Sequence, residues 1–182
     1  MAEIFEVRRH SLRGEGKSLS PEGIALAHHA TDTLLGNYQA VYTSPKPRAV
    51  ETTEALGFDT YTQVPELGTF PKAIDDHDKH VQALIQRTQC TRLAAYWAIP
   101  ATHRTLEQFG TALFDKFCEL AAALHPGKNA LAISHGGSIE AAILAAMPEW
   151  DLADIGPELR ECEAACFVFD HQLFRRIEFI RL

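Results

Sequence analysis

The architecture of this protein follows from one segment, Leu131-Ala132-Ile133-Ser134-His135-Gly136-Gly137. Its apolar run has the length of a buried strand, and a histidine and two glycines close it. Near the start of the chain, a second run, Ile4 to Val7, is followed by Arg9-His10. Parallel strands end at one edge of a sheet, and open α/β sheets bind ligands there. We therefore expect His10 and His135 to share one site if their strands are neighbours.

A third strand end contributes a cation to the same edge. Gln39 to Thr43 is a short apolar run, and Ser44-Pro45-Lys46-Pro47-Arg48-Ala49 follows it. Ser44-Pro45 is a helix start signal, and the predicted helix ends near Gly57. Arg48 would then lie in the first turn of this helix, beside the two histidines.

Helices are predicted between the strands. Ser20-Pro21-Glu22 starts one that can run to about Gly36, since a serine cap, a proline and an acid stand in the preferred order. Apolar residues at helical spacing predict another from Leu106 to Leu124, ended by Pro126-Gly127. A further helix runs from Ser138 to Ala146.

Length and composition are typical of one soluble domain spanning residues 1–182. The chain has 182 residues, of which 46% are hydrophobic, and a chain of this size folds without disulfides or a structural metal. The Cys162 and Cys166 pair has no matching second pair, so a zinc site is not expected and the four cysteines read as ordinary thiols. No signal peptide and no stretch of about 20 apolar residues is present, so we expect a cytoplasmic protein without a membrane partner.

The charge balance limits the partners. There are 17 Lys and Arg against 24 Asp and Glu, giving a net charge of -7, which argues against a nucleic-acid-binding surface. A small phosphate ligand is compatible with this balance, because two arginines in a cleft outweigh a diffuse acidic exterior over a screening length of about 8 Å.

The ordered set of motifs resembles the histidine phosphatases, also called the phosphoglycerate mutase-like superfamily. The family's marks are an Arg-His pair, a Ser-Pro-x-x-Arg-Ala segment, a middle glutamate and a Ser-His-Gly segment. Their counterparts, in order, are Arg9-His10, Ser44 to Ala49, Glu66 in Val64-Pro65-Glu66-Leu67-Gly68, and Ser134-His135-Gly136. The strand pattern and this resemblance predict an α/β protein, a three-layer α/β/α sandwich with a mostly parallel central sheet. A C-terminal hairpin (Ala165 to Phe169 and Phe174 to Ile180) and a helical capping insertion (about 71–100, with helical periodicity around Val81-Leu84-Ile85) complete it.

The residues permit phosphoryl transfer without a metal or other cofactor. Neutral His10 can attack phosphorus to give a phosphohistidine, and the charges of Arg9 and Arg48 favour the neutral imidazole. The two guanidinium groups match phosphate geometry, and His135 and the backbone at Gly136 can donate to the phosphoryl group. The resemblance implies that Glu66 protonates the leaving group and later activates water. Arg13 is either a third phosphate contact or a surface charge.

Two departures from the family pattern bear on function. Ser11 replaces the usual glycine after the first histidine, where its side chain either crowds the phosphate or donates to it. The Thr and Asn typical of the mutases are not evident in Leu12 to Lys17. We therefore predict a phosphomonoesterase acting on a small phosphorylated metabolite or a phosphorylated peptide or protein. A phosphoglycerate mutase-type transferase and a non-catalytic module that binds phosphorylated ligands are the alternatives, and the sequence leaves the oligomeric state open.

Three other patterns in the sequence bear on ligand binding. Gly14-Glu15-Gly16-Lys17-Ser18 resembles the end of a P-loop, but Ser11 stands where that motif needs its first glycine, and the helix start signal comes later, at Ser20-Pro21. Residues 75–80 combine metal-ligand types, but consecutive ligands in one loop rarely surround an ion, so a solvated loop is favoured. We expect specificity to come from cations of the insertion: Lys72, His77, Lys79, Arg87 and Arg92.

Overall fold

A twisted β-sheet with helices on both faces forms the core of this computed structural model, which describes residues 2–182 without the side chain of Asp75. Six strands are described, in the order β3-β2-β4-β1-β5-β6. Strands β1 to β4 are parallel, whereas β5 is antiparallel to β1 and β6 is antiparallel to β5. Their bounds are β1 Glu3–Arg9, β2 Tyr38–Thr43, β3 Thr62–Gln63, β4 Asn129–Ser134, β5 Ala164–Asp170 and β6 Leu173–Ile180.

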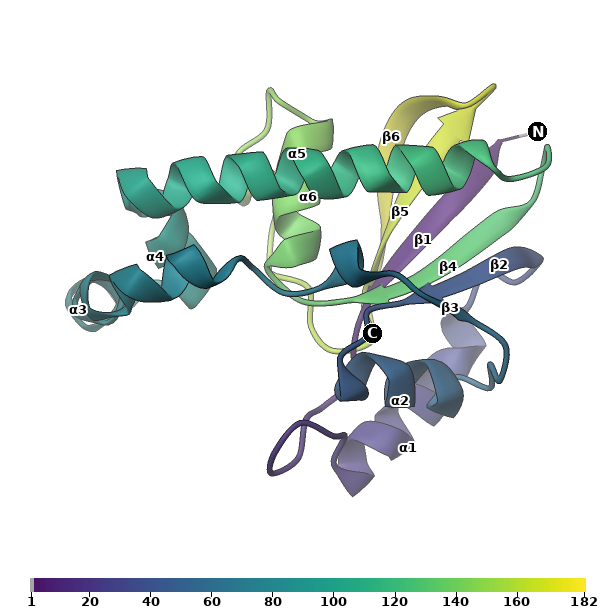
Figure 1. The fold of residues 1–182 in the computed structure, drawn as a ribbon, viewed down its shortest axis with the longest axis horizontal. Helices are drawn as coiled ribbons and strands as arrows, with labels where there is room; N and C mark the ends of the chain where they lie inside the picture. Colours follow the sequence, from purple (N-terminus) through teal and green to yellow (C-terminus); the bar gives the residue numbers. More distant parts are fainter. Residues whose placement is uncertain (1) are drawn as a thin grey trace.

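The helices form the two outer layers. Figure 1 shows α1 and α2 on one face of the sheet and α5 and α6 on the other, which confirms the predicted α/β/α sandwich. The α-helices are α1 Pro21–Ala30, α2 Pro47–Ala55, α3 Asp78–Thr88, α4 Arg92–Ala98, α5 Pro100–Ala122, α6 Ser138–Ala146 and α7 Leu152–Ile155. Short 3-10 helices are η1 Thr31–Thr33, η2 Pro65–Leu67 and η3 Lys72–His77. Within the described residues, no helix is long and apolar enough to span a membrane.

Strand β4 explains why both faces are covered. Leu131 and Ile133 pack into the core against α1 and α2, and Ala130 and Ala132 pack into the core against α5 and α6. All four are fully buried, as is typical of a central parallel strand with helices on both sides. The carboxyl end of this strand therefore opens at an edge that the helices flank but do not cover.

Strand β1 is longer than the predicted run, which ended at Val7. Arg8 is fully buried in the continuation, where it contacts Glu6 and donates to Thr33 Oγ1 and to the carbonyl of Cys162, both at 2.9 Å. A buried charge is tolerated when it is paired and hydrogen-bonded, which the apolar pattern alone does not reveal.

Two predicted helix boundaries are wrong. The helix predicted to reach Gly36 ends at Ala30, where the chain turns through η1 and a Thr31 hydroxyl bonded to the carbonyl of His28. Helix α2 begins at Pro47 rather than at Pro45, because the residue before a proline, here Lys46, is disfavoured in helical conformation. Arg48 is still in the first turn, as predicted.

A third predicted boundary is also wrong, because α5 starts earlier than expected. Helix α5 begins at Pro100, six residues before the predicted Leu106, since Pro100 is pre-organised for the first helical position and Thr102 bonds back to Ile99. The helical insertion is confirmed: η3, α3 and α4 form a small apolar cluster against the start of α5. The predicted C-terminal hairpin is also confirmed as β5 and β6, joined at His171-Gln172.

Candidate active site

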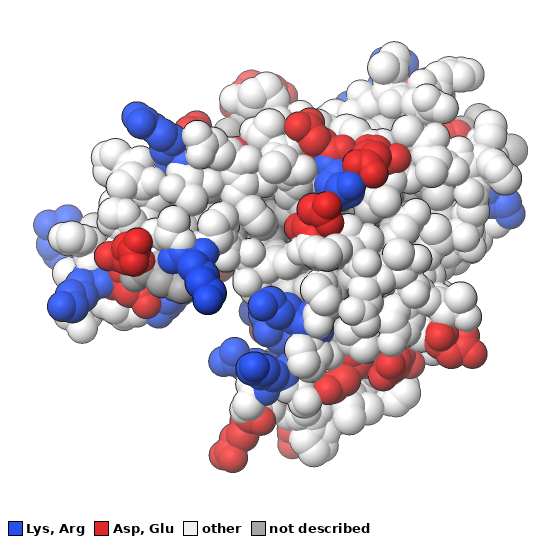
Figure 2. Space-filling view, viewed as in Figure 1, with Lys and Arg blue, Asp and Glu red and all other residues white. Residues whose placement is uncertain are grey.

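A cavity of about 510 Å³ opens at the carboxyl edge of the parallel strands, between the sheet and the insertion. Figure 2 shows Lys and Arg side chains on both sides of this hollow. Five predicted site residues, Arg9, His10, Arg48, His135 and Gly136, line it together. The remaining lining residues are Thr69, Phe70, Lys72, Arg92, Leu93, Tyr96, Gly137, Ser138 and Glu158.

Strand pairing brings the two histidines together. Arg9 is in register with Ser134, the last residue of β4, so the next residue of each strand is a histidine. The backbone N–H of His10 donates to the carbonyl of Ser134 at 2.9 Å. The two imidazole rings lie 5.1 Å apart between centroids, at an angle of 65°. This spacing places both rings within reach of one tetrahedral anion.

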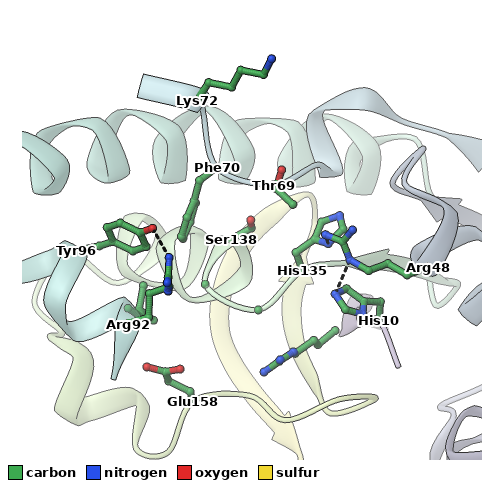
Figure 3. Close-up of a pocket in the computed structure, with 14 residues that line it drawn as sticks. His10, Arg48, Thr69, Phe70, Lys72, Arg92, Tyr96, His135, Ser138 and Glu158 are labelled. Atoms are coloured by element: carbon green, nitrogen blue, oxygen red, sulfur yellow. Dashed lines mark hydrogen bonds between the residues drawn. The ribbon is translucent and has the colours of Figure 1, made fainter. Parts of the chain in front are cut away.

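Arg48 contacts both imidazoles (Figure 3). Its Nε donates to Nε2 of His10 at 2.9 Å, and its Nη2 donates to Nδ1 of His135 at 3.0 Å. A guanidinium group can only donate, so both ring nitrogens accept and carry no proton. The other nitrogens carry the protons: His10 Nδ1 donates to the Ser11 carbonyl at 2.7 Å, and His135 Nε2 donates to Ser44 Oγ at 2.9 Å. The lone pair of His10 Nε2 is thus directed at the Nε–H of Arg48, which lines the cavity beside it.

Both imidazoles are held neutral. Burial, followed by the charges of Arg48 and Arg9, lowers the pKa of His10 from 6.5 to about 4. Burial and the charge of Arg48 lower the pKa of His135 to about 2. The arginines act in the predicted direction, but loss of water is the larger cause. A neutral His10 has the lone pair that a nucleophile needs near pH 7.

The guanidinium group of Arg9 is held by residues of the loop before β5. Its Nη1 donates to the Leu159 carbonyl at 2.6 Å, and its Nη2 contacts Glu161 at 2.5 Å. Its Nε is buried and has no hydrogen-bond partner among the described residues. A Cβ on Gly136 would lie 2.9 Å from this Nε, so the glycine lets the guanidinium group lie against the backbone. This unpaired N–H lies in the wall of the cavity, against the backbone of Gly136.

The structure places Ser11 and Arg13, the two residues with open predictions, differently relative to the cavity. The Ser11 hydroxyl is fully buried and donates to the Gly23 carbonyl at 2.7 Å, so it neither crowds the cavity nor donates into it. Arg13 is exposed and lines an adjoining hollow with Arg9, His10 and Arg48. Arg13 does not line the main cavity, and its charge contributes to the lowered pKa of both His10 and Arg48.

The predicted proton donor, Glu66, is not among the residues that line the cavity. It lies in η2, its side chain is 53% exposed, and its carboxylate is 3.8 Å from Lys116 Nζ. A different carboxylate, Glu158, lines the cavity from the segment between α7 and β5. Sequence reasoning missed Glu158 because it lies in a loop of no regular pattern and outside every motif.

Of the five cations of the insertion that were predicted to set specificity, two line the cavity. Lys72 and Arg92 line the cavity, whereas His77, Lys79 and Arg87 do not. The Lys72 side chain points away from the other lining groups, and Arg92 and Tyr96 lie near Phe70 (Figure 3). A Cβ on Gly137 would lie 2.7 Å from Phe70, so a glycine is required where the insertion meets the end of β4.

The P-loop alternative does not fit the local structure. Residues 14–18 form a tight loop in which Gly14 N–H donates to the Ser18 carbonyl, and a bridge pairs Arg13 with Leu19. The next helix begins at Pro21 and not at Lys17. Among the side chains that the structure describes, no group of three His, Cys, Asp or Glu is placed to hold a metal ion.

The chain belongs to the histidine phosphatase superfamily, branch 1, whose family model matches residues 7–177. No match was found among curated protein sequences. Among solved structures, mycobacterial hydrolase 1 is 18% identical with a TM-score of 0.71, over 98% of this chain and 97% of that one. Mycobacterial glucosyl-3-phosphoglycerate phosphatase in complex with VO3 is 18% identical with a TM-score of 0.68, over 98% and 97% of the two chains. A phosphoserine phosphatase variant from Entamoeba histolytica, in complex with phosphoserine, is 15% identical with a TM-score of 0.59, over 96% of each chain. These similarities show the shared fold.

Proposed function

We propose that this protein is a phosphatase that hydrolyses small phosphate monoesters through a phosphohistidine on His10. The contact of Arg48 with Nε2 of His10 and Nδ1 of His135 carries the proposal. One guanidinium group fixes two neutral imidazoles around a space of anion size. The family membership and the phosphatases among the structural neighbours support the same reaction.

In the first step, the lone pair on Nε2 of His10 attacks phosphorus and forms the P–N bond, while the ester P–O bond breaks. The released alkoxide takes a proton and leaves as an alcohol. In the second step, a water oxygen attacks phosphorus and gives one proton to the Glu66 carboxylate, the P–N bond breaks, and Nε2 regains its lone pair as inorganic phosphate forms. Splitting one displacement into two in this way lowers the barrier of each.

The cations have defined tasks in this scheme. Arg48 moves its Nε–H hydrogen bond from the imidazole to a phosphate oxygen, which frees the lone pair of His10 Nε2 to form the P–N bond. The unpaired Nε–H of Arg9 donates to a second oxygen after a shift of its guanidinium group. His135 donates to the phosphoryl group after its Nε2–H turns from Ser44. Arg13, beside the cavity, adds positive charge at the entrance. These groups take the place that a metal ion has in other phosphatases.

Glu66 is the proposed source of the leaving-group proton. Its helix η2 is joined to the site, because Ser134 Oγ donates to the Leu67 carbonyl at 2.9 Å. Among the described residues, the Glu66 carboxylate has one polar contact, 3.8 Å from Lys116 Nζ, and rotation about its side-chain bonds is the movement that the scheme requires.

The test is turnover of phenyl phosphate with release of inorganic phosphate, measured with and without a chelator, by the wild type and by His10→Ala. We expect chelator-insensitive release that His10→Ala abolishes. Equal turnover by the variant would contradict the proposal. Transfer of the phosphoryl group to a second hydroxyl instead of water would indicate a mutase.

A further inference from the structure

The cavity has a second charged region, formed by Arg92 and Glu158. Figure 3 shows these two side chains on one side of the cavity, and His10 and Arg48 on the opposite side. They come from different elements, since Arg92 begins α4 in the insertion and Glu158 precedes β5. One end of the cavity is therefore purely cationic, and the other end presents both signs of charge.

Arg92 is fixed at the rim with donors to spare. Its Nη1 contacts Asp78 at 3.3 Å and the Tyr96 hydroxyl at 3.1 Å, while its side chain stays 54% exposed. Among the described residues, Nε and Nη2 of Arg92 have no hydrogen-bond partner. Leu93 and Tyr96 are buried, which anchors the first turn of α4 under the guanidinium group. The Nε–H and the Nη2 amino group are thus available to a carboxylate.

Glu158 is positioned through the backbone of its neighbour Leu159, and its own carboxylate is unpaired among the described residues. The N–H of Leu159 donates to Glu140 at 2.8 Å, and the carbonyl of Leu159 accepts from Arg9 at 2.6 Å. Glu140 also accepts from the N–H of Gly137, so one buried side chain joins this loop to the end of β4 that carries His135. In the described part of the chain, no hydrogen bond or ion pair involves the Glu158 carboxylate.

The unpaired carboxylate of Glu158 in a phosphate-binding cavity favours a ligand that carries a positive group. It repels the phosphate dianion, and the other charged lining residues, Arg9, Arg48, Lys72 and Arg92, are all cations. The repulsion is offset when the substrate brings an ammonium group to Glu158, while Arg92 binds a negative group of the same molecule.

We propose that Arg92 and Glu158 form a zwitterion subsite, and that the preferred substrates are phosphate monoesters of short chains bearing both a carboxylate and an ammonium group. O-Phosphoserine has this chemistry. The inference rests on the proposed function, because the phosphate must be held at His10 for its far end to reach this region.

The experiment compares kcat/KM for four substrates: O-phosphoserine (both groups), 3-phosphoglycerate (carboxylate only), phosphoethanolamine (ammonium only) and phenyl phosphate (neither). Each charge-assisted contact contributes a factor of about ten or more, so O-phosphoserine should exceed both singly charged analogues by at least that factor. Equal values for O-phosphoserine and 3-phosphoglycerate would overturn the role of Glu158, and equal values for O-phosphoserine and phosphoethanolamine would overturn that of Arg92.

Two variants separate the contacts. Glu158→Gln should reduce the preference for O-phosphoserine over 3-phosphoglycerate to about one, and Arg92→Gln should do the same for its preference over phosphoethanolamine. Arg87→Gln, in the same insertion but outside the cavity, is the control and should keep both ratios. Ratios that neither variant alters would contradict the subsite.

A failure of the zwitterion subsite can be distinguished from a failure of the proposed phosphatase function. Hydrolysis of phenyl phosphate that depends on His10, without a preference among the charged substrates, keeps the phosphatase and rejects the subsite. Calorimetry with His10→Ala measures the affinity for the same compounds without turnover. O-Phosphoserine should bind more tightly than either singly charged analogue. Equal affinities there would also reject it.

Discussion

The Nε atom of Arg48 lies 2.9 Å from Nε2 of His10 and donates a hydrogen bond to the lone pair of this nitrogen. The same guanidinium group reaches His135 through Nη2 at 3.0 Å. A planar fork that donates along two directions can hold both rings at once, and a lysine ammonium group lacks this rigid geometry. Substitution of Arg48 should therefore disturb the positions of both imidazoles.

Arg48→Lys should lower kcat/KM for phenyl phosphate by about a hundredfold, because one of the two contacts is lost along with bidentate binding of the phosphate. Steady-state kinetics measures this. Arg87→Lys, outside the cavity, should stay within about twofold of the wild type as the matched control. An equally small effect of Arg48→Lys would show that a positive charge at this position is enough for catalysis and that the fork geometry of the guanidinium group is not required.

Stability should rise with pH between about 4 and 6.5. The folded pKa of His10 is about 4 and that of His135 is about 2, against 6.5 for an ordinary histidine. The unfolded chain therefore binds more protons in this window, and the stabilising contribution, complete above pH 6.5, is lost as the pH falls. Urea unfolding at several pH values measures the slope.

Replacing the histidines should flatten that slope. His10→Asn and His135→Asn each remove one group that, between about pH 4 and 6.5, binds its proton in the unfolded chain and not in the folded chain; His171→Asn, at an exposed histidine outside the site, is the matched control. A slope unaltered by either site variant would contradict the assignment of neutral imidazoles.

Gly136→Ala should impair catalysis more than folding. The added Cβ meets Arg9 at 2.9 to 3.0 Å, so the guanidinium group must shift while the surrounding backbone stays in place. We expect a loss of about tenfold or more in kcat/KM with a small change in the free energy of unfolding. Parallel kinetics and urea denaturation separate the two effects.

Gly110→Ala provides the contrast. There the added Cβ would lie 2.3 Å from the backbone oxygen of Ala141, where α5 packs on α6, so the helices themselves must separate. Overpacking of this kind costs about 1–3 kcal/mol of stability. If Gly136→Ala destabilised the protein by as much, its effect on activity would not be specific to Arg9.

Glu66→Gln should slow esters with poor leaving groups most. An alkoxide needs a proton as the P–O bond breaks, whereas 4-nitrophenolate leaves without one, so the loss should be about a hundredfold for alkyl esters and about tenfold or less for 4-nitrophenyl phosphate. Lys116→Gln, which frees the Glu66 carboxylate, should retain the leaving-group dependence of the wild type. An equal loss for both kinds of ester would remove Glu66 as the acid.

Much of the fold could be predicted because its signals are local. Apolar runs at β4 and β5 and the helix from Ser138 to Ala146 depend on neighbouring residues only. The end of β1 could not be predicted, because Arg8 is buried by partners distant in the chain, Thr33 and Cys162. The same limit applies to helix ends set by tertiary contacts.

For the candidate site, motif order placed Arg9, His10, Arg48 and His135 correctly at one cavity, because each follows a parallel strand. The position of Glu66 outside the cavity lining could not be foreseen, since it depends on how η2 turns its side chain toward Lys116. Glu158 was missed for a similar reason: only folding brings its loop, 148 residues after His10, to the same cavity.

The most direct measurement is chemical trapping of the intermediate. The protein is mixed with a phosphate monoester, quenched within milliseconds to seconds in alkali, digested and analysed by mass spectrometry, with phosphorus NMR to identify the nitrogen. The account predicts an acid-labile, alkali-stable phosphoryl group on Nε2 of His10, absent from His10→Ala. A turning-over enzyme whose phosphoryl group is found on another residue, or on none, would contradict it.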